Sequence, residues 1–349
     1  MSKDRGLTPE HIRALRLEKP KQRDRDFAQV HGISEAELVA AYVGHGVTPV
    51  VADLDQLMEA AMQLGEVMAL TRNQSCVHEK VGQYGNYRRG PHAGMIFNGD
   101  IDLRFFPSHW KHAFFVEREM GDSLRRSIQV FDAAGDAVHK IFLRDEAFIP
   151  AWDAAKARLA LPNPSDVLEV GARKPTQGPK VDLNKVDELR SAWSRMTDTH
   201  QFMRITSDLK INRLGAYHMA GAPFARRLVV DALDQALQGA QAQGIEIMVF
   251  TGNMGCIQIH SGPIETLQSM GPWQNVMDPR FNLHLRLDHI AEVWAVDKSS
   301  VDGPAISVEA FDAEGMLICQ LFGVGGKNSH RPAWNTLVEG LQPLEAVDA

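Results

Sequence analysis

Two stretches of this chain, residues 66–142 and 246–322, align with each other without a gap at a constant offset of 180 residues. Of the 77 aligned positions 16 are identical, among them Cys76 and Cys256, whereas unrelated sequences of ordinary composition agree at roughly one position in sixteen. The period is far longer than the roughly 20–50 residues of a solenoid repeat. The chain is therefore predicted to contain two copies of a domain-sized unit. Its chemistry is expected where the two copies differ, or between them.

Composition limits the classes of protein to which the chain can belong. Its 349 residues are enough for two domains of ordinary size. The net charge of −7 gives the surface as a whole no attraction for nucleic acid or anionic lipid. The three cysteines form no closely spaced pair and no disulfide framework, which fits reduced thiols in a cytoplasm. The N-terminus is charged and lacks an apolar core, and no run of about 18 apolar residues occurs, so we expect a cytoplasmic protein.

Each copy is predicted to begin with helices and to continue as a long antiparallel meander. Ser34 and Glu37 form a capping-box pattern ahead of an apolar run. Strand-like segments without intervening helices favour antiparallel pairing. The predicted helices cover residues 7–42 (as several short helices), 53–64, 187–203 and 223–243, and the predicted strands of the first copy cover residues 67–70, 75–79, 93–97, 101–105, 113–117, 127–131 and 138–143. The predicted fold class is α+β, a tandem duplication in which each half is a large antiparallel sheet with flanking helices.

Proline and charged residues are frequent in residues 151–185, which is typical of a connecting segment. We predict an N-terminal repeat over residues 1–160, a linker over residues 161–185 and a C-terminal repeat over residues 186–349.

Residues 23–44 resemble a helix-turn-helix, which would make the chain a DNA-binding regulator. The alternative is two ordinary packed helices. The expected recognition helix would place Glu35 and Glu37 where contacts to DNA phosphates should lie, which makes DNA a poor candidate partner.

Histidine is the residue type most worth sorting, because the chain contains 14. His109 and His112 have a helical metal-ligand spacing in a strand-like context, so we interpret them as ordinary residues. His260 and His284 fall in predicted strands and are read as hydrogen-bonded core residues. His200 differs, because the corresponding place in the first copy carries Arg25. One neutral imidazole suits axial ligation of a macrocyclic iron better than a protein-only metal site, which needs three or four ligands.

A second asymmetry between the copies is Arg104, which aligns with His284. Arg104 lies among Leu103, Phe105 and Phe106, and composition alone favours a surface residue whose charged end reaches water.

Several long motifs make the chain resemble a known family. They are residues 71–84, 100–106 and 109–114 in the first copy, and residues 198–202, 250–263, 271–276 and 281–286 in the second. With these motifs the chain closely resembles the HemS/ChuS type of bacterial cytoplasmic haem proteins, called hemin-degrading factors, from about residue 8 to residue 323.

The resemblance implies haem (iron protoporphyrin IX) in a cleft of the C-terminal half, with His200 as the axial ligand of the iron. It implies that Arg104 and Phe106 cover the opposite face of the haem, and that Arg104 is the catalytic residue if haem is degraded. It gives His78 as a further haem contact. It gives Arg213, Lys298 and Gln320 as partners of the haem propionates.

The chain departs from the family pattern near its C-terminal end. Ser299 follows Lys298 where the family usually has proline, and the basic residues expected soon after residue 323 are absent, so Lys327 or Arg331 is expected to take their place. Haem is a large apolar plate with two carboxylates and an iron, and the residues implied above are of the kinds that such a ligand requires.

We therefore expect a cytoplasmic haem-binding protein of bacterial iron acquisition, which passes haem on, takes part in its oxidative breakdown with release of iron, or does both. The sequence does not separate a carrier from a haem oxygenase-like enzyme. Expected partners are haem, an inner-membrane haem importer or a downstream haem oxygenase, and an electron donor if the protein is an enzyme. It is expected to be a monomer or a dimer.

Overall fold

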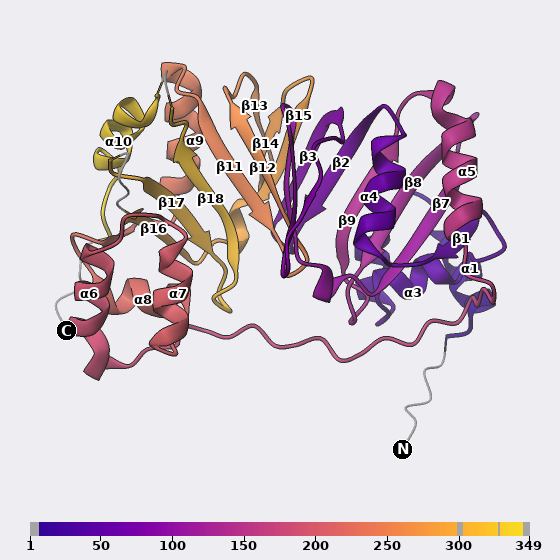
Figure 1. Ribbon diagram of the computed structural model, residues 1–349, viewed down its shortest axis with the longest axis horizontal. Helices are drawn as coiled ribbons and strands as arrows, with labels where there is room; N and C mark the ends of the chain where they lie inside the picture. The colour runs from indigo at the N-terminus through magenta and orange to yellow at the C-terminus, as the bar shows by residue number, and fades with distance from the viewer. Residues whose placement is uncertain (1–6, 299–302, 327–328, 345–349) are drawn as a thin grey trace. The chain divides into compact units, whose positions relative to one another are not determined.

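The computed structural model describes residues 7–298, 303–326 and 329–344, and it divides the chain into two compact units (Figure 1). Unit 1 comprises Met1–Arg72, Glu79–Lys174 and Gly252–Gln258. Unit 2 comprises Asn73–His78, Pro175–Thr251 and Ile259–Ala349. Each unit is thus built mainly from one repeat and holds a short segment of the other repeat.

Unit 1 combines helices with antiparallel strands. Its helices are α1 (Pro9–Glu18), α2 (Asp24–Val30), α3 (Glu35–Ala40), α4 (Leu54–Met62) and α5 (Ile149–Leu159). Its strands are β1 (Val47–Val50), β2 (Glu66–Arg72), β4 (Arg88–Arg89), β5 (Gly94–Asn98), β6 (Ile101–Phe105), β7 (His112–Met120), β8 (Ser123–Phe131) and β9 (Ala137–Leu143), and it shares β3 (Cys76–Gln83) with unit 2.

Local sequence explains where the helices of unit 1 begin. Ser34 and Glu37 form the predicted capping box at the start of α3. The Asp53 side chain accepts a hydrogen bond from the Gln56 backbone N–H, 3.0 Å away, at the start of α4. Apolar residues of α4 and α5 then pack on one face of the sheet, where Trp152 is fully buried.

Unit 2 repeats this plan. Its helices are α6 (Val186–Ser194), α7 (Gln201–Asp208), α8 (Arg213–Ala220), α9 (Ala232–Gln243) and α10 (Arg331–Glu339). Its strands are β10 (Ala225–Leu228), β11 (Ile247–Gly252), β13 (Leu267–Met270), β14 (Trp273–Met277), β15 (Phe281–Arg286), β16 (Glu292–Asp297), β17 (Ile306–Phe311) and β18 (Leu317–Gly323), and it shares β12 (Cys256–Gly262) with unit 1.

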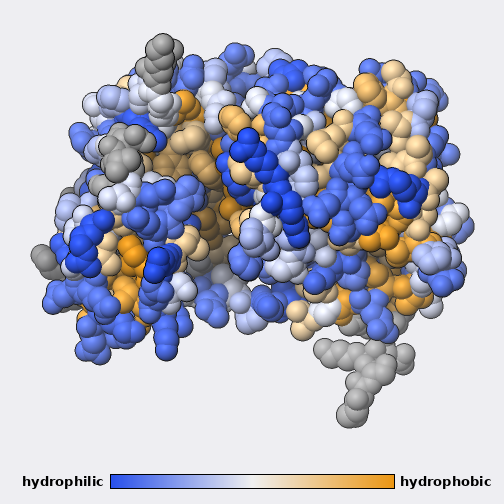
Figure 2. Space-filling model, in the orientation of Figure 1, coloured by the Kyte–Doolittle hydropathy of each residue, from blue (hydrophilic) through white to orange (hydrophobic). Residues whose placement is uncertain are grey.

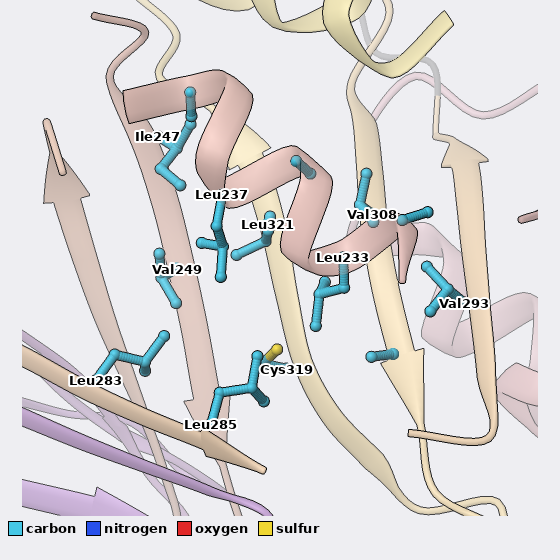
Figure 3. Packing of buried hydrophobic residues seen from close by; sticks show 14 of the residues in the cluster. Leu233, Leu237, Ile247, Val249, Leu283, Leu285, Val293, Val308, Cys319 and Leu321 are labelled. Atoms are coloured by element: carbon cyan, nitrogen blue, oxygen red, sulfur yellow. The ribbon is translucent and has the colours of Figure 1, made fainter. Parts of the chain in front are cut away.

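In unit 2 the strands β10, β16, β17, β18 and β11 pair in that order, and different helices cover the two faces that they form. On one face Leu233 and Leu237 of α9 pack against Val249, Val308 and other buried residues (Figure 3). Successive strand residues point to opposite faces. On the other face Trp294 and Phe311 pack with α6, α7 and α8. The second face carries the candidate site described below.

The strands form two nine-stranded sheets, with the orders β1-β7-β8-β9-β2-β3-β15-β14-β13 and β10-β16-β17-β18-β11-β12-β6-β5-β4. Neighbouring strands pair antiparallel, among them β1 with β7, β8 with β9, β11 with β18 and β16 with β17. The α+β fold class and the duplication predicted from the sequence are therefore confirmed.

The segments Asn73–His78 and Gly252–Gln258 occupy equivalent places, each in the unit formed mainly by the other repeat. Their hydrogen bonds recur at the repeat offset of 180 residues. Asn73 Nδ2 donates to Ile318 O over 2.7 Å, and the equivalent Asn253 Nδ2 donates to Val138 O over 2.9 Å. Arg286 N donates to Ser75 O over 2.8 Å, and the equivalent Phe106 N donates to Gly255 O over 3.0 Å. The side chains of Cys76 and Thr251 are 3.4 Å apart, as are those of the equivalent Cys256 and Thr71. The duplication therefore includes the contacts that fix these exchanged segments.

Two predicted helices need correction. The helix expected over residues 187–203 is two helices, α6 and α7, separated by the turns that carry His200. The helix expected over residues 223–243 begins only at Ala232, because Ala225–Leu228 pairs as β10 with β16. The four residues of this strand include no β-branched side chain, so the sequence pattern did not predict extended structure there. The predicted end of this helix is confirmed, since Gly244 closes it in the left-handed region.

Residues 149–159, part of which had been read as connecting segment, form α5 because Trp152 and Leu159 are buried in the core of unit 1. The prediction also missed the short strand β1, which pairs with β7. In the part of the chain that the structure describes, no helix has the length and apolar character needed to cross a bilayer.

Candidate functional site

His200 lies on the surface of unit 2, at the residue that immediately precedes α7. Its side chain is 93 % exposed. Its Nδ1 lies 2.7 Å from Asp198 Oδ1, and its backbone N–H donates to the same oxygen over 2.8 Å. The Gln201 side chain accepts a hydrogen bond from Thr197 N over 2.9 Å, which holds the turn closed. The imidazole is thus held at Nδ1 by the Asp198 carboxylate, while its other ring nitrogen, Nε2, points away from that carboxylate.

This arrangement fits axial ligation of an iron. A carboxylate on Nδ1 holds the proton there, so that Nε2 keeps the lone pair that a metal requires. The hydrogen bond from the His200 backbone, and to a smaller extent the one from its side chain, lower the pKa of the Asp198 carboxyl. Among the described residues no group of three or more His, Cys, Asp or Glu side chains could hold a metal ion by itself. A porphyrin iron needs one protein ligand on this side, and the imidazole of His200 is a group of that kind.

Behind α7, a charge cluster is built around Glu309 of β17, whose side chain is fully buried at 0 % exposure. Arg213 Nη1 donates to Glu309 Oε2 over 3.1 Å, and Tyr217 Oη donates to the same oxygen over 2.7 Å. Ser307 Oγ donates to the other oxygen over 2.8 Å, and Lys298 Nζ also pairs with it. Two of the predicted propionate partners, Arg213 and Lys298, are thus brought together, but both are already paired with a carboxylate of the protein.

The two cations differ in how far a ligand could reach them. The Arg213 side chain is 24 % exposed, and its Nη2 lies 3.5 Å from the sulfur of Met203. The Lys298 side chain is only 4 % exposed. Burial lowers the pKa of Lys298 to about 8. Burial by itself would raise the pKa of Glu309, but Lys298 and Arg213 outweigh it and hold that pKa at about 2. The cluster therefore contains an ionised carboxylate with two cations around it.

Gln320 lies on the sheet face that bears Glu309, because the two residues are directly opposite each other on β18 and β17. Phe250 of β11 is opposite Gln320 on its other side. The rings of Phe250 and Phe322 meet edge to face with centroids 5.3 Å apart, and both are only partly buried. Figure 2 shows the recessed surface over β11 and β18 as largely apolar. An apolar, aromatic strip beside a guanidinium is the kind of surface that a flat macrocycle with carboxylates would cover.

Arg104 and Phe106 belong to unit 1. Arg104 is on β6, and its 35 % exposed side chain pairs with Asp102 two residues earlier on the same strand face. Phe106 follows β6 and is partly buried, and its backbone N–H donates to Gly255 O over 3.0 Å. The alternation of β6 sends Leu103 and Phe105 into the core and leaves Arg104 on the open side. The pairing of Arg104 with Asp102 was not anticipated from the sequence, although the two residues are two positions apart.

His78 is fully buried in unit 2, where its ring lies edge to face against Phe281 with centroids 4.9 Å apart. Its predicted role as a haem contact stays a prediction, and it would require the imidazole to become accessible. His260 stacks on Phe281 and bonds Pro263 O, and it is buried as predicted. His284 bonds Asn275 over 2.7 Å as predicted, but it is only partly buried and is not a core residue.

The helix-turn-helix interpretation is wrong. Five of the six residues of α3, the expected recognition helix, are buried. Ala36 and Val39 pack against Phe114 and Phe131 of the sheet. A recognition helix must present its residues to the major groove, and α3 instead forms part of the core.

Of the residues expected near the C-terminal end of the site, Ser299 and Lys327 lie outside the described residues. Arg331 begins α10, and its guanidinium lies beside Gly325.

Two residues of the candidate site were not predicted from the sequence. Asp198 could have been suspected, because an acidic residue two positions before a histidine can bond its ring in a turn. Glu309 gave no such signal, since its partners lie far away along the chain.

Comparisons with known proteins identify the family of the chain. A family model described as "Haemin-degrading HemS.ChuX domain" matches the chain twice, over residues 32–159 and 210–341. The hemin transport protein HmuS of Yersinia pestis is 39 % identical over 320 residues, which cover 91 % of this chain and 92 % of that protein.

Two solved structures are similar along nearly the whole chain. The crystal structure of holo-PhuS, a heme-binding protein from Pseudomonas aeruginosa, superposes with a TM-score of 0.91 at 38 % identity and covers 97 % of this chain and 100 % of that one. The structure of ChuS, described as an E. coli heme oxygenase, gives a TM-score of 0.83 at 33 % identity over 94 % of this chain and 98 % of that one. Both copies of the family domain and these full-length similarities lead to one conclusion: the chain belongs to the haemin-degrading HemS/ChuX family.

Proposed function

We propose that this protein binds haem through unit 2 and serves bacterial haem uptake and iron acquisition in the cytoplasm, by carrying haem, by taking part in its oxidative breakdown, or by both. The observation that carries the proposal is His200, exposed at the surface with Nδ1 held by Asp198. Membership of the family supports it, as do relatives that are named as a hemin transport protein and a heme-binding protein.

The rest of unit 2 supplies the other groups that haem needs. Arg213 offers a partly exposed guanidinium for a propionate, and Phe250 and Phe322 offer an aromatic surface for the ring. Gln320 lies between these two features on the sheet face. We propose Lys298 as a contributor of positive charge to the propionates and His78 as a further haem contact.

On the opposite face of the haem we propose Arg104 and Phe106. A guanidinium can donate charge-assisted hydrogen bonds to a polar group near the iron, which an apolar wall could not do. Haem would supply the iron and the oxidisable ring, while the protein binds, orients and polarises. Arg104 would be the residue that matters for breakdown, because it is the only cation among the four residues of this segment, Leu103 to Phe106.

Haem titration of the purified protein tests the proposal. The wild-type protein should give the Soret band of histidine-bound haem. His200→Ala should change that band and weaken the affinity by roughly 100-fold, about 2.7 kcal/mol. His45→Ala, which removes another exposed histidine from unit 1, is the matched control and should leave both unchanged. An unaltered Soret band in His200→Ala would remove His200 from the site.

Carrier and enzyme are separated by product analysis. The ferrous haem complex is exposed to oxygen and an electron donor, with catalase present to remove free peroxide. If the wild-type protein cleaves the tetrapyrrole and Arg104→Ala does not, the protein is an enzyme. A relative described as a heme oxygenase is the reason for this test. Intact haem that transfers to an added haem oxygenase favours the carrier. The proposed partners are accordingly an inner-membrane haem importer and either a downstream haem oxygenase or an electron donor.

A further inference from the structure

The buried carboxylate of Glu309 has no role in the proposed function so far, although it holds two of the residues that would bind haem. We propose that Glu309 is a positioning residue. By holding Nη1 of Arg213, it orients the guanidinium so that the opposite edge, with Nη2, can bind a propionate carboxylate of haem. This inference rests on the proposed function and deepens it, since it names the group that determines the preference for an anionic porphyrin.

The geometry of Arg213 supports this role. A guanidinium is a rigid planar fork, so fixing one edge also fixes the other. Nη1 is fixed inward by Glu309 Oε2 at 3.1 Å and lies 3.4 Å from Tyr217 Oη. Nη2 lies beside Met203, a side chain that is itself largely exposed and whose sulfur is only a weak acceptor. A ligand carboxylate would offer this outer edge a much stronger acceptor than the thioether does.

Lys298 has a different part in the cluster. Its ammonium is buried against Glu309 and lies 5.1 Å from the centre of the Phe202 ring. It therefore balances the charge of Glu309, and Arg213 supplies the charge that is left over. With one carboxylate and two cations, the cluster keeps a net positive charge for an anionic ligand.

The aligned position in unit 1 shows that the fold does not require a carboxylate here. Gln129 of β8 aligns with Glu309, and Ser127 aligns with Ser307. Gln129 is buried and its Nε2 donates to Ser127 Oγ over 3.0 Å. A glutamine can thus occupy this strand position beside a serine, and the carboxylate of Glu309 needs an explanation other than folding.

The test compares two ligands in Glu309→Gln. One is haem, and the other is the iron porphyrin whose two propionates are esterified. If Glu309 positions Arg213 for a carboxylate, the variant should lose roughly 10-fold in affinity for haem but less than about 2-fold for the ester. Tyr217→Phe, which removes one donor to Glu309, should show a smaller loss of roughly 3-fold with the same preference. This second variant decides the question alone if Glu309→Gln does not fold.

Glu292→Gln is the matched control. Glu292 is a partly buried carboxylate of the same sheet, and it accepts from His218 Nε2 at 3.0 Å. It should leave both affinities unchanged. Equal losses for haem and ester in Glu309→Gln would show a structural role, and unchanged or tighter haem binding would show that Glu309 competes with the ligand; either result overturns the inference. If the wild-type protein binds neither ligand, the proposed function itself fails, which is a distinguishable result.

Discussion

The two units place a charged residue at the same point, directly after the N-cap of a helix that packs on the sheet, but they place opposite charges there. In unit 1 the N-cap Ser34 is followed by Glu35, and in unit 2 the N-cap Asn212 is followed by Arg213. An acidic residue in the first turn interacts favourably with the helix dipole, whereas a cation there opposes it. Unit 2 therefore keeps an arrangement that the helix itself does not favour.

The partners of the two residues are reversed as well. Glu35 pairs with Arg72 and Lys140, and its pKa, which burial alone would raise, is held at about 2 by Lys140 and Arg72. Arg213 pairs instead with Glu309. The aligned positions have diverged accordingly, because Lys140 aligns with Gln320 and Arg72 with Gly252.

The accessible charge differs between the two clusters. In unit 1 the carboxylate is buried on the helix and its cations point inward toward it. In unit 2 the long Arg213 side chain reaches both the buried Glu309 and the surface. The cluster around Glu35 can therefore contribute to stability alone, whereas the cluster around Glu309, with the charges reversed, also leaves a cation for an anionic ligand.

The largest expected effect comes from removing the carboxylate of unit 1. Glu35→Gln should lower the free energy of unfolding by about 3 kcal/mol, because it leaves the buried Lys140 and the partly buried Arg72 without a counter-charge. Glu309→Gln should lower it by only about 1 kcal/mol, since Lys298 can lose its proton and Arg213 reaches water. Urea unfolding of both variants measures the difference. Equal losses would show instead that the two clusters contribute equally to stability.

Acid should weaken both clusters. Glu35 and Glu309 have folded-state pKa values of about 2, below the ordinary value of 4.5. Their stabilisation is therefore complete above pH 4.5 and is lost as the pH falls toward 2. By pH 3 the loss should be roughly 2 kcal/mol for each carboxyl. Urea unfolding at pH 5 and pH 3 checks this, and the double variant Glu35→Gln with Glu309→Gln should show a flatter dependence. An unchanged slope in that variant would contradict the assignment.

The smallest expected effects concern the aligned residues Lys140 and Gln320, one of which should affect stability and the other haem binding. Lys140→Gln, which gives unit 1 the residue of unit 2, should lower the free energy of unfolding by about 1.5 kcal/mol and leave haem affinity unchanged. Gln320→Ala should do the reverse, with little loss of stability and roughly 3-fold weaker haem binding. Urea unfolding and haem titration on the same preparations make the measurement. Weaker haem binding in Lys140→Gln would show that unit 1 also contributes a charge site for the ligand.

Much of the fold followed from local pattern. The Ser34 capping box, the end of α9 at Gly244 and the strands around the repeated turns were all predictable, because short-range hydrogen bonds and alternation decide them. The start of α9 was not, since β10 forms only when β16 is there to pair with it. The split of α6 from α7 also escaped the pattern, although it creates the turn on which His200 sits.

The residues proposed for the site could be predicted from the sequence, but the ion pairs and hydrogen bonds between them could not. His200, Arg213 and Lys298 could be named from motifs. That Arg213 and Lys298 share one buried carboxylate could not, because Glu309 lies 96 positions from Arg213. The proposed helix-turn-helix failed for the same reason, since burial of α3 depends on Phe114 and Phe131 of a distant hairpin.

From the sequence alone it follows that two related modules are present, that certain turns and helix starts recur in them, and that His200 in one copy corresponds to an arginine in the other. Only the tertiary structure decided that residues 73–78 and 252–258 change places between the modules and that opposite charges meet at equivalent helix starts. The physical reason is range: capping and alternation act over a few residues, whereas a buried ion pair forms only when packing brings distant strands and helices to within about 3–4 Å.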